Sequence, residues 1–456
     1  IHTYRGVFGS HVANVLRRLQ RLCRFYGSDP QFICASATIA NPREHAERLI
    51  EQPFTLIDES QNGAPQGRKD FILYNPPIID EELGLRAGTV PAAKDAAATF
   101  LAQDIQTIVF ARARQTVELL LSYLRDELAY LGRDVTPLDG QLPAVMGYRG
   151  GYLPLERRAI EAGLRDGTVR GVVTTNALEL GIDIGALDAA VLTGYPGTIA
   201  GTWQQVGRAG RRAERSAAIL VAGNGALDQY LCLHPRYLFG RSPEHALTNP
   251  DNLPILTRHL LCAAFELPFA DDEAFGGFDP VKPVLDDLAR AGDLHATRNQ
   301  YHYVGDGAPS SGVSLRTGGD DTVVIQDLSG DQPNVIGQID LAGAAQMVHE
   351  GAIYMHQART YLVDRLDWDG RVADVYPVDV DYYTRANIGS TIRRLEAVDE
   401  QERDGLTIAH GEATVVTQAT GYRKVRRYTN ETLGFGPIDL PAMTLETTGY
   451  WLVFSE

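Results

Sequence analysis

The chain has 456 residues, of which 44% are hydrophobic and 22% charged, values typical of a soluble globular protein with about three domains. Its 42 Lys and Arg against 58 Asp and Glu give a net charge of −16, which argues against a uniformly basic nucleic-acid-binding protein. No run of about 18 apolar residues occurs, so no membrane span is predicted, and we expect a cytoplasmic protein without a membrane partner.

The first 56 residues predict a helix, a strand and a second helix. Apolar residues recur at helical spacing from Val12 to Leu22, residues 31–35 predict a buried strand, and Asn41 before Pro42 predicts a capped helix start. Polar, turn-rich residues 60–69 then predict a linker. Positive charge is concentrated locally, in arginines 17, 18, 21 and 24 and again near residues 157 and 208.

Between about residues 70 and 240, short apolar segments alternate with helical patterns. A helix is predicted over residues 113–131, and buried strands are predicted over residues 107–110, 171–174, 189–192 and 218–221. Short apolar strands separated by helices predict a parallel sheet that is covered on both faces.

The pattern changes after residue 250. Helices over residues 255–265 and 281–291, followed by a turn into residues 294–304, resemble a recognition helix and its wing, although an ordinary helical bundle would give a similar pattern. From residue 311 onward, a small antiparallel barrel or sandwich is predicted by short β-rich runs at residues 322–325, 334–339, 352–355, 359–363, 372–375 and 413–416.

The segment Gln-Gln-Val-Gly-Arg-Ala-Gly-Arg-Arg at residues 204–212 places Arg208 and Arg211 three residues apart. Two guanidinium groups on adjacent helical turns suit the clamping of phosphate, because they stay charged and form planar forks. A solvated surface cluster is the alternative. Upstream, residues 172–185 read Val-Val-Thr-Thr-Asn-Ala-Leu-Glu-Leu-Gly-Ile-Asp-Ile-Gly, an apolar strand, a polar turn and an aspartate near glycines.

Together these two segments resemble motifs V and VI of the superfamily 2 helicases, and they are most similar to the MrfA-type DExH group of DNA-repair helicases. Ile1-His2 resembles the second half of a DExH box, and Ser36-Ala37-Thr38 resembles motif III. The resemblance implies an α/β fold with a RecA-like parallel sheet. We expect the end of a first RecA-like domain at 1–56, the second at 57–245, a winged-helix-like domain at 246–310 and a β-rich domain at 311–456.

The resemblance also implies an ATP and Mg²⁺ site. Arg211 would be the arginine finger with Arg208 beside it, Gln204 would bridge to His2, and Asp183 with Gly181 would contact the nucleotide. Ion pairs for the arginines and a helix cap for Asp183 are the alternatives.

The chain contains no G-x-x-x-x-G-K-[ST] segment. We therefore expect a missing N-terminal half to complete the ATP site, and this chain alone not to hydrolyse ATP. The zinc module of the MrfA group is expected beyond Glu456. No metal site is predicted here, because the four cysteines and the histidines lack ligand spacing.

The expected nucleic-acid contacts follow from the same motifs. Thr174 and Thr175 end a strand where hydroxyls commonly take phosphate. The segment Gly-Tyr-Arg-Gly-Gly-Tyr at 147–152 matches a family segment that would stack bases and hold phosphate, although it also reads as a simple turn. The candidate contacts are Tyr148, Arg149, Tyr152 and Arg112, with Arg114 similar to Arg112; Ser36 and Thr38 would couple domain movement to hydrolysis.

These features predict a DNA-repair motor that acts on single-stranded DNA, or on DNA with a single-stranded tail. The resemblance implies 3′ to 5′ movement and makes a repair nuclease a candidate partner. Two alternatives stay open: an RNA helicase or Lhr-type DExH helicase, and a non-catalytic nucleic-acid-binding scaffold.

Overall fold

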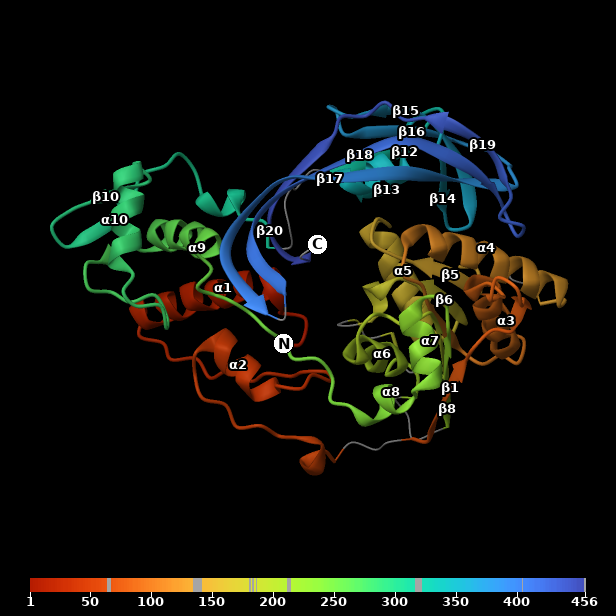
Figure 1. Ribbon diagram of the computed structural model, residues 1–456, viewed down its shortest axis with the longest axis horizontal. Coiled ribbons are helices and arrows are strands. Elements are labelled where there is room, and N and C mark those ends of the chain that lie inside the picture. Colours follow the sequence, from red (N-terminus) through yellow and green to blue (C-terminus); the bar gives the residue numbers. More distant parts are fainter. Residues whose placement is uncertain are drawn as a thin grey trace. The chain divides into compact units, whose positions relative to one another are not determined.

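The computed structural model describes residues 1–63, 67–133, 142–179, 182, 184–185, 187–210, 215–315, 322–403 and 405–454 (Figure 1). The chain forms two compact units. The first comprises Ile1–Asn75, Gly194–Ser216 and Ala222–Asp320, and the second comprises Pro76–Thr193, Ala217–Val221 and Asp321–Glu456. The predicted second motor domain at 57–245 contributes to both units, so its boundaries stay predictions.

A parallel sheet lies at the centre of the RecA-like part of the second unit. Neighbouring strands are all parallel, in the order β8 (Ser216–Val221), β7 (Ala189–Thr193), β4 (Thr107–Phe110), β6 (Gly171–Thr174) and β5 (Val145–Tyr148). Every residue of β4, β5 and β6 is buried, as expected for strands covered on both faces. The predicted strands and the parallel sheet are therefore confirmed.

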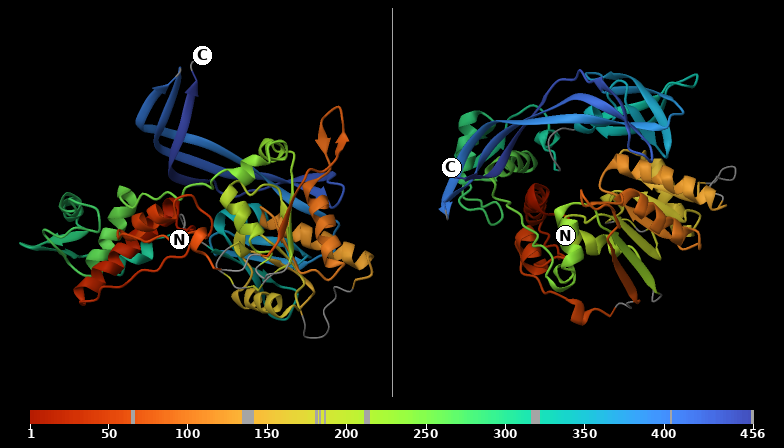
Figure 2. Two further views of the ribbon diagram at one scale, coloured as in Figure 1. Left: turned by 90° about the horizontal axis from the view of Figure 1, so that it is seen from below. Right: turned by 45° about the vertical axis from the view of Figure 1, so that its right-hand side comes forward.

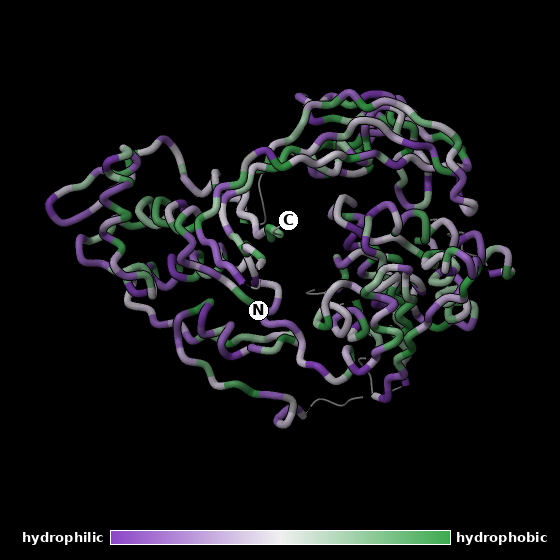
Figure 3. Tube along the Cα trace, in the orientation of Figure 1, coloured by the Kyte–Doolittle hydropathy of each residue, from purple (hydrophilic) through white to green (hydrophobic). Residues whose placement is uncertain are grey.

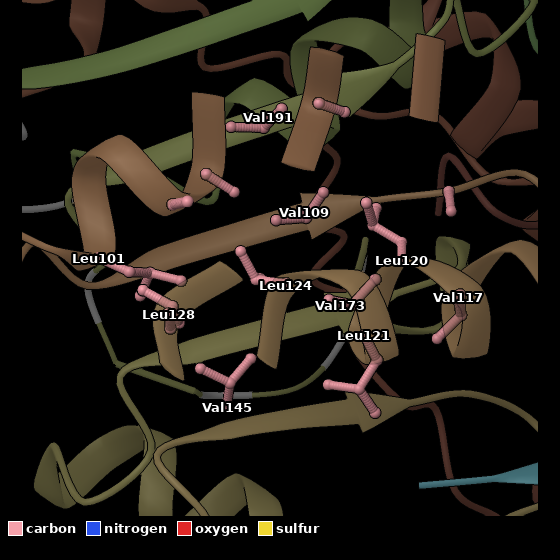
Figure 4. Close-up of a cluster of buried hydrophobic side chains, with 14 of the residues drawn as sticks. Leu101, Val109, Val117, Leu120, Leu121, Leu124, Leu128, Val145, Val173 and Val191 are labelled. Carbon is pink, nitrogen blue, oxygen red and sulfur yellow. The ribbon is translucent and has the colours of Figure 1, made fainter. Parts of the chain in front are cut away.

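Two helices cover one face of this sheet, α3 (Thr89–Leu101) and α4 (Arg114–Tyr130). Their side chains form one core with the strands, in which Leu120, Leu121 and Leu124 of α4 are fully buried between Val109 and Val173 (Figure 4). Each buried leucine contributes about 1.5–3 kcal/mol relative to an exposed one. This core holds the start of α4 at the carboxyl end of β4.

The remaining elements of the region between residues 57 and 245 are short. They are η1 (Glu59–Gln61), β1 (Lys69–Tyr74), β2 (Ile78–Asp80), β3 (Leu85–Arg86), α5 (Pro154–Asp166), η2 (Asn176–Leu178), α6 (Ile199–Val206), α7 (Ala226–Leu233) and α8 (Arg236–Gly240).

The predicted helices of the N-terminal segment are present as α1 (Gly6–Phe25) and α2 (Pro42–Ile50), but residues 31–35 form no strand. A strand needs a neighbouring strand for its backbone hydrogen bonds, and within the described ranges no strand pairs with this segment. Asn41 does not cap α2 with its side chain. Instead, its amide binds the backbone of Ala246 in both directions, at 3.1 and 2.8 Å.

Residues 253–303 form a winged helix rather than a helical bundle. The helices α9 (Leu253–Glu266) and α10 (Lys282–Ala291) pack with an antiparallel sheet in the order β10 (Leu294–Ala296), β11 (Gln300–Tyr303) and β9 (Phe269–Ala270). The short helix η3 (Pro309–Gly312) follows. The predicted wing is therefore confirmed.

Three arginines of α1, Arg17, Arg18 and Arg21, bind acidic residues of the first unit, whereas Arg24 is exposed. Arg17 is buried and lies 2.6 Å from Glu51 and 2.8 Å from Asp251, and Arg21 lies 2.5 Å from Glu273. These carboxylates neutralise most of the local positive charge of this helix. The ion pairs hold α1 against α2 and the winged helix.

The same packing buries a histidine pair, which predicts a pH dependence of stability. His11 Nδ1 lies 3.0 Å from His259 Nε2. Burial lowers the pKa of His259 to about 3 and also lowers the pKa of His11. Because an unfolded histidine titrates near about 6.5, the unfolded state binds more protons below that pH. Stability should fall as pH drops from about 6.5, by up to about 1.4 kcal/mol per pH unit for each histidine.

Urea unfolding between pH 7.5 and 5 measures this slope. His259→Gln should flatten it, whereas His295→Gln in the exposed wing should leave it unchanged. An equal slope in all three proteins would contradict the prediction.

The first half of the β-rich region is a five-stranded sheet with one helix. Its order is β13 (Asn334–Asp340), β12 (Thr322–Asp327), β16 (Val372–Pro377), β15 (Arg359–Asp367) and β14 (Ile353–His356), and α11 (Leu341–Met347) follows β13. The pair β12 and β16 is parallel, so the sheet is mixed rather than purely antiparallel.

A second sheet contains two unusually long strands, β17 (Tyr382–Arg403) and β18 (Leu406–Arg426), with β19 (Thr432–Pro437) and β20 (Met443–Phe454) on the other edge of β18 (Figure 2). The strand predicted at residues 413–416 is part of β18 and was predicted too short. Polar residues on both faces of β18 hide the alternation of apolar and polar residues that marks a strand. The end of the hairpin is largely hydrophilic (Figure 3). Among the described residues neither sheet closes into a barrel, and the predicted alternative, a sandwich, stays a prediction.

Candidate nucleotide and nucleic-acid site

The helix that precedes the two motif VI arginines is held at both ends. At its start, the Glu244 carboxylate accepts hydrogen bonds from the backbone N–H groups of Ile199 (2.7 Å) and Ala200 (3.0 Å). At its end, Lys69 Nζ donates to the carbonyl of Val206 (2.8 Å). An anion at the N-terminus and a cation at the C-terminus both complement the helix dipole. This arrangement gives the arginine-bearing turn a rigid base.

Of the residues expected at the nucleotide, the structure describes only some. Gln204 lies half-buried on α6, and Arg208 is 4% exposed and has interaction partners. Arg211 lies outside the described residues, as do Asp183 and Gly181. The nucleotide contacts of all five therefore stay predictions. Lys69 and Glu244 were not predicted, because both lie far along the chain from α6.

The motif V strand ends in two threonines with different surroundings. Thr174 is fully buried, and its hydroxyl has no partner within the described part of the chain. Thr175 is 9% exposed and caps η2 by accepting a hydrogen bond from Ala177 N at 3.4 Å. A buried hydroxyl does not reach a phosphate, so the prediction for Thr174 holds only if the following turn moves. Thr175 is buried as well, and its phosphate contact also stays a prediction.

The residues expected in motifs II and III lie close together. The backbone N–H of Ala37 donates to His2 Nδ1 at 2.7 Å, and burial lowers the pKa of His2. The Nε2 atom of His2 has no hydrogen-bond partner among the described residues, so the expected bridge to Gln204 is not formed here. Ser36 and Thr38 are exposed, and their coupling role stays a prediction.

The Gly-Tyr-Arg-Gly-Gly-Tyr segment does not face solvent, which corrects its predicted role. Arg149 is 1% exposed, and its Nε lies 2.8 Å from the buried Glu118 carboxylate. Its Nη2 atom donates to Tyr354 Oη (3.1 Å) and to the carbonyl of Met355 (3.0 Å). The Tyr152 hydroxyl donates to the same Glu118 oxygen at 2.6 Å. A guanidinium and a ring so enclosed cannot contact DNA.

Further contacts show that this segment joins the end of β5 to the hairpin between β14 and β15. Tyr148 is buried and donates to Glu161 at 2.7 Å, so it is also unavailable for base stacking. The Gln357 side-chain amide binds the backbone of Gly147 in both directions, at 3.1 Å each. The Ala358 N–H donates to Glu118 at 3.1 Å. The sequence signal for this network was Glu118 itself, a carboxylate within the apolar run of α4.

The close packing of this segment predicts a strong effect at Gly151. Its φ of 105° is unfavourable for any other residue, and an added Cβ would lie 2.5 Å from the carbonyl oxygen of Gln338. We expect Gly151→Ala to lower the free energy of unfolding by about 2–4 kcal/mol, from backbone strain plus a clash. Gly197→Ala is the matched control, since its φ is 102° with open space around it. If thermal unfolding shows equal losses of stability for the two variants, the Cβ added at residue 151 does not clash with Gln338.

Two arginines follow strand β4. Arg112 is exposed and has interaction partners, and its predicted contact with nucleic acid stays a prediction. Arg114 forms an ion pair with Asp340 at 2.9 Å, at the start of α11. The start of α4 therefore faces the β-rich part of the same unit.

The described residues contain neither a metal-binding cluster nor a membrane-spanning helix. No group of three or more His, Cys, Asp or Glu side chains has the arrangement of a metal site. No helix in the described ranges is long and apolar enough to span a membrane.

Two family models match the chain. Residues 93–213 match the "Helicase conserved C-terminal domain", and residues 248–318 match the "ATP-dependent helicase HRQ1, winged helix domain". The RecA-like sheet and the winged helix that follows it thus correspond to domains of superfamily 2 helicases.

Individual relatives identify the kind of helicase more closely than the two models do. The chain is 48% identical to the "Uncharacterized ATP-dependent helicase YprA" of Bacillus subtilis, over 99% of this chain and 59% of that protein. It is 32% identical to the ATP-dependent helicase HRQ1 of Saccharomyces cerevisiae, over 99% of this chain and 42% of that protein. The structure of the helicase MrfA bound to DNA matches with a TM-score of 0.89 and 48% identity, covering 99% of this chain and 59% of that one.

The chain is therefore a close homologue of the YprA and MrfA helicases. It spans about three-fifths of the length of the YprA and MrfA proteins that it matches.

Proposed function

We propose that this chain supplies the second motor domain, the winged helix and the β-rich domain of an ATP-driven helicase that moves along single-stranded DNA. The observation that carries this proposal is the match to DNA-bound MrfA, which extends over 99% of the chain at 48% identity. A match of that extent includes the winged helix and both β-rich sheets as well as the motor fold.

ATP use is supported from two sides. A second MrfA structure, bound to DNA and AMPPNP, matches with a TM-score of 0.86 and 46% identity. In this chain, Glu244 and Lys69 hold α6, so the turn after Val206 that carries Arg208 starts from a rigid base. The residues present therefore fit one side of a nucleotide site. A P-loop and an acidic pair must supply the phosphate cradle and hold Mg²⁺, and no P-loop motif occurs in the 456 residues.

The finer parts of the proposal are a role in DNA repair, movement from 3′ to 5′, and inactivity of this chain by itself. They follow from the resemblance to the MrfA group together with the incomplete ATP motifs. A repair nuclease remains a candidate partner.

A strand-displacement assay tests the proposal. The chain, joined to the P-loop-bearing segment that completes the motor, would be given DNA duplexes with a 3′ tail, a 5′ tail or no tail, and matched RNA duplexes. We expect ATP-dependent displacement of the 3′-tailed DNA only, and no ATP hydrolysis by this chain alone. Displacement from a 5′ tail would overturn the polarity, and preference for RNA would overturn the substrate. Binding without hydrolysis by the completed motor would favour a scaffold.

A further inference from the structure

A large cleft lies within the second unit, between the RecA-like part and the β-rich part. Its volume is about 1170 Å³, above the range of about 300–1,000 Å³ that is usual for small-molecule sites. Its walls are the starts of α3 and α4, the helix α11, the first residues of β17 and the turn between β18 and β19. Of the candidate site residues, only Arg114 lines this cleft.

The cleft is positively charged although the chain is acidic. Its lining contains Lys94, Arg114 and Arg385 against a single carboxylate, Asp340, in a chain of net charge −16. Lys94 and Arg114 already have acidic partners. Arg385 is exposed and takes part in none of the ion pairs formed by the described residues. It is therefore the cation that this cleft offers to a ligand.

A second arginine lies directly opposite Arg385. Arg423 of β18 is its register partner across the β17–β18 pair, so both side chains project from the same face of the sheet. Like charges at opposed positions destabilise a sheet. The Nε atom of Arg423 is buried and lacks a hydrogen-bond partner within the described residues. Both guanidinium groups act on Tyr383, which lines the cleft, and they oppose the rise in its pKa that burial causes. An anion between the two arginines would relieve the repulsion between their guanidinium groups and would accept a hydrogen bond from Arg423 Nε.

An aromatic platform stands at the same cleft. The rings of Tyr428 and Tyr123 stack with centroids 4.2 Å apart, and Tyr428 is 56% exposed. Its backbone is in the left-handed region, with φ of 63°, which is uncommon for a bulky residue. Three contacts hold it there: the ring stack, a hydrogen bond from its N–H to Tyr123 Oη (3.0 Å), and one from its hydroxyl to Asp126. Strained residues that are held this firmly cluster at functional sites.

We propose that this cleft binds a segment of single-stranded DNA, with Arg385 and Arg423 holding a phosphodiester and Tyr428 stacking a base. Positive charge that follows the backbone, together with exposed aromatic rings, is the chemistry by which proteins hold single strands without reading sequence. The proposal rests on the proposed function and adds the β-rich region to the track. A DNA strand bound in this cleft would contact both the start of α4 and the β-rich sheet.

The test is a salt titration of fluorescent oligo(dT) binding to the completed protein and its variants. Each phosphate contact on a single strand contributes about 0.7 to the slope of log K against log salt concentration. Because Arg385 and Arg423 would hold one phosphodiester together, Arg385→Ala with Arg423→Ala should flatten the slope by about 0.7. Tyr428→Leu should weaken binding about 5- to 150-fold with an unchanged slope. Arg365→Ala, an exposed arginine on β15, is the control.

Two further readouts separate binding from folding. In the absence of DNA, the double arginine variant should melt at the same temperature as the parent or higher, because it removes a like-charge pair. Ultraviolet crosslinking of an oligonucleotide that contains 5-iodouracil should map to the 427–430 turn in the unaltered protein. An unchanged slope with crosslinks elsewhere overturns this inference while leaving the proposed function standing. A parent protein that binds no single-stranded DNA overturns both, and equal binding of RNA removes the preference for DNA.

Discussion

Arg149→Met is expected to lower the free energy of unfolding by about 3–5 kcal/mol, because it leaves the Glu118 carboxylate buried without its counter-charge. Glu118 is fully buried, and Arg149 is 1% exposed. Chemical denaturation of the variant and the parent measures the loss. Arg158→Met, in the same region but exposed, is the control and should stay within about 0.5 kcal/mol of the parent.

A double-mutant cycle sharpens this result. Glu118→Leu combined with Arg149→Met should cost less than the sum of the two single variants, because no unpaired charge remains buried. If Arg149→Met proves no less stable than Arg158→Met, then Arg149 is not enclosed as described. The prediction that Arg149 contacts DNA would then stand again.

Arg211→Ala is expected to reduce the kcat of DNA-stimulated ATP hydrolysis by roughly 10³- to 10⁵-fold in the completed motor, the effect of removing an arginine finger. DNA binding should be retained. Arg211→Lys should restore little, since an ammonium group lacks the planar fork. Steady-state kinetics with saturating DNA measures the change.

The control for this prediction lies four residues along the chain. Arg215 belongs to the same basic segment, but its guanidinium pairs with Asp70 at 2.8 Å and is 69% exposed. Arg215→Ala should hydrolyse ATP like the parent. If the two variants lose activity equally, the loss reflects the charge of the segment, and the finger assignment is wrong.

The strands of the RecA-like sheet were predictable because each is buried on both faces. Residues 107–110 and 171–174 are continuous apolar runs, and such runs indicate parallel strands wherever helices separate them. The winged helix was predictable for a related reason, since a helix, a glycine turn and two short strands follow one another locally. The long strands β17 and β18 were not, because their partners and twist, rather than alternating hydrophobicity, define them.

The candidate site shows the same division. The spacing of Arg208 and Arg211 and the threonines of motif V could be read from the chain, because each motif is local. The burial of Arg149 could not, since it depends on Glu118, 31 residues earlier, and on Tyr354, 205 residues later. A glycine-rich loop with tyrosines and an arginine looks the same in sequence whether it faces DNA or another domain.

The sequence by itself determined the family, the parallel sheet and the identity of the motif residues, because these depend on local periodicity and short spacing. Only the tertiary structure decided which charges are available to a ligand. It pairs Arg17, Arg21 and Arg149 with buried or half-buried carboxylates, and it sets Arg385 opposite Arg423 beside a cleft. The reason is that the pairing of charges depends on which distant segments the fold brings together, and the order of residues along the chain does not specify that directly.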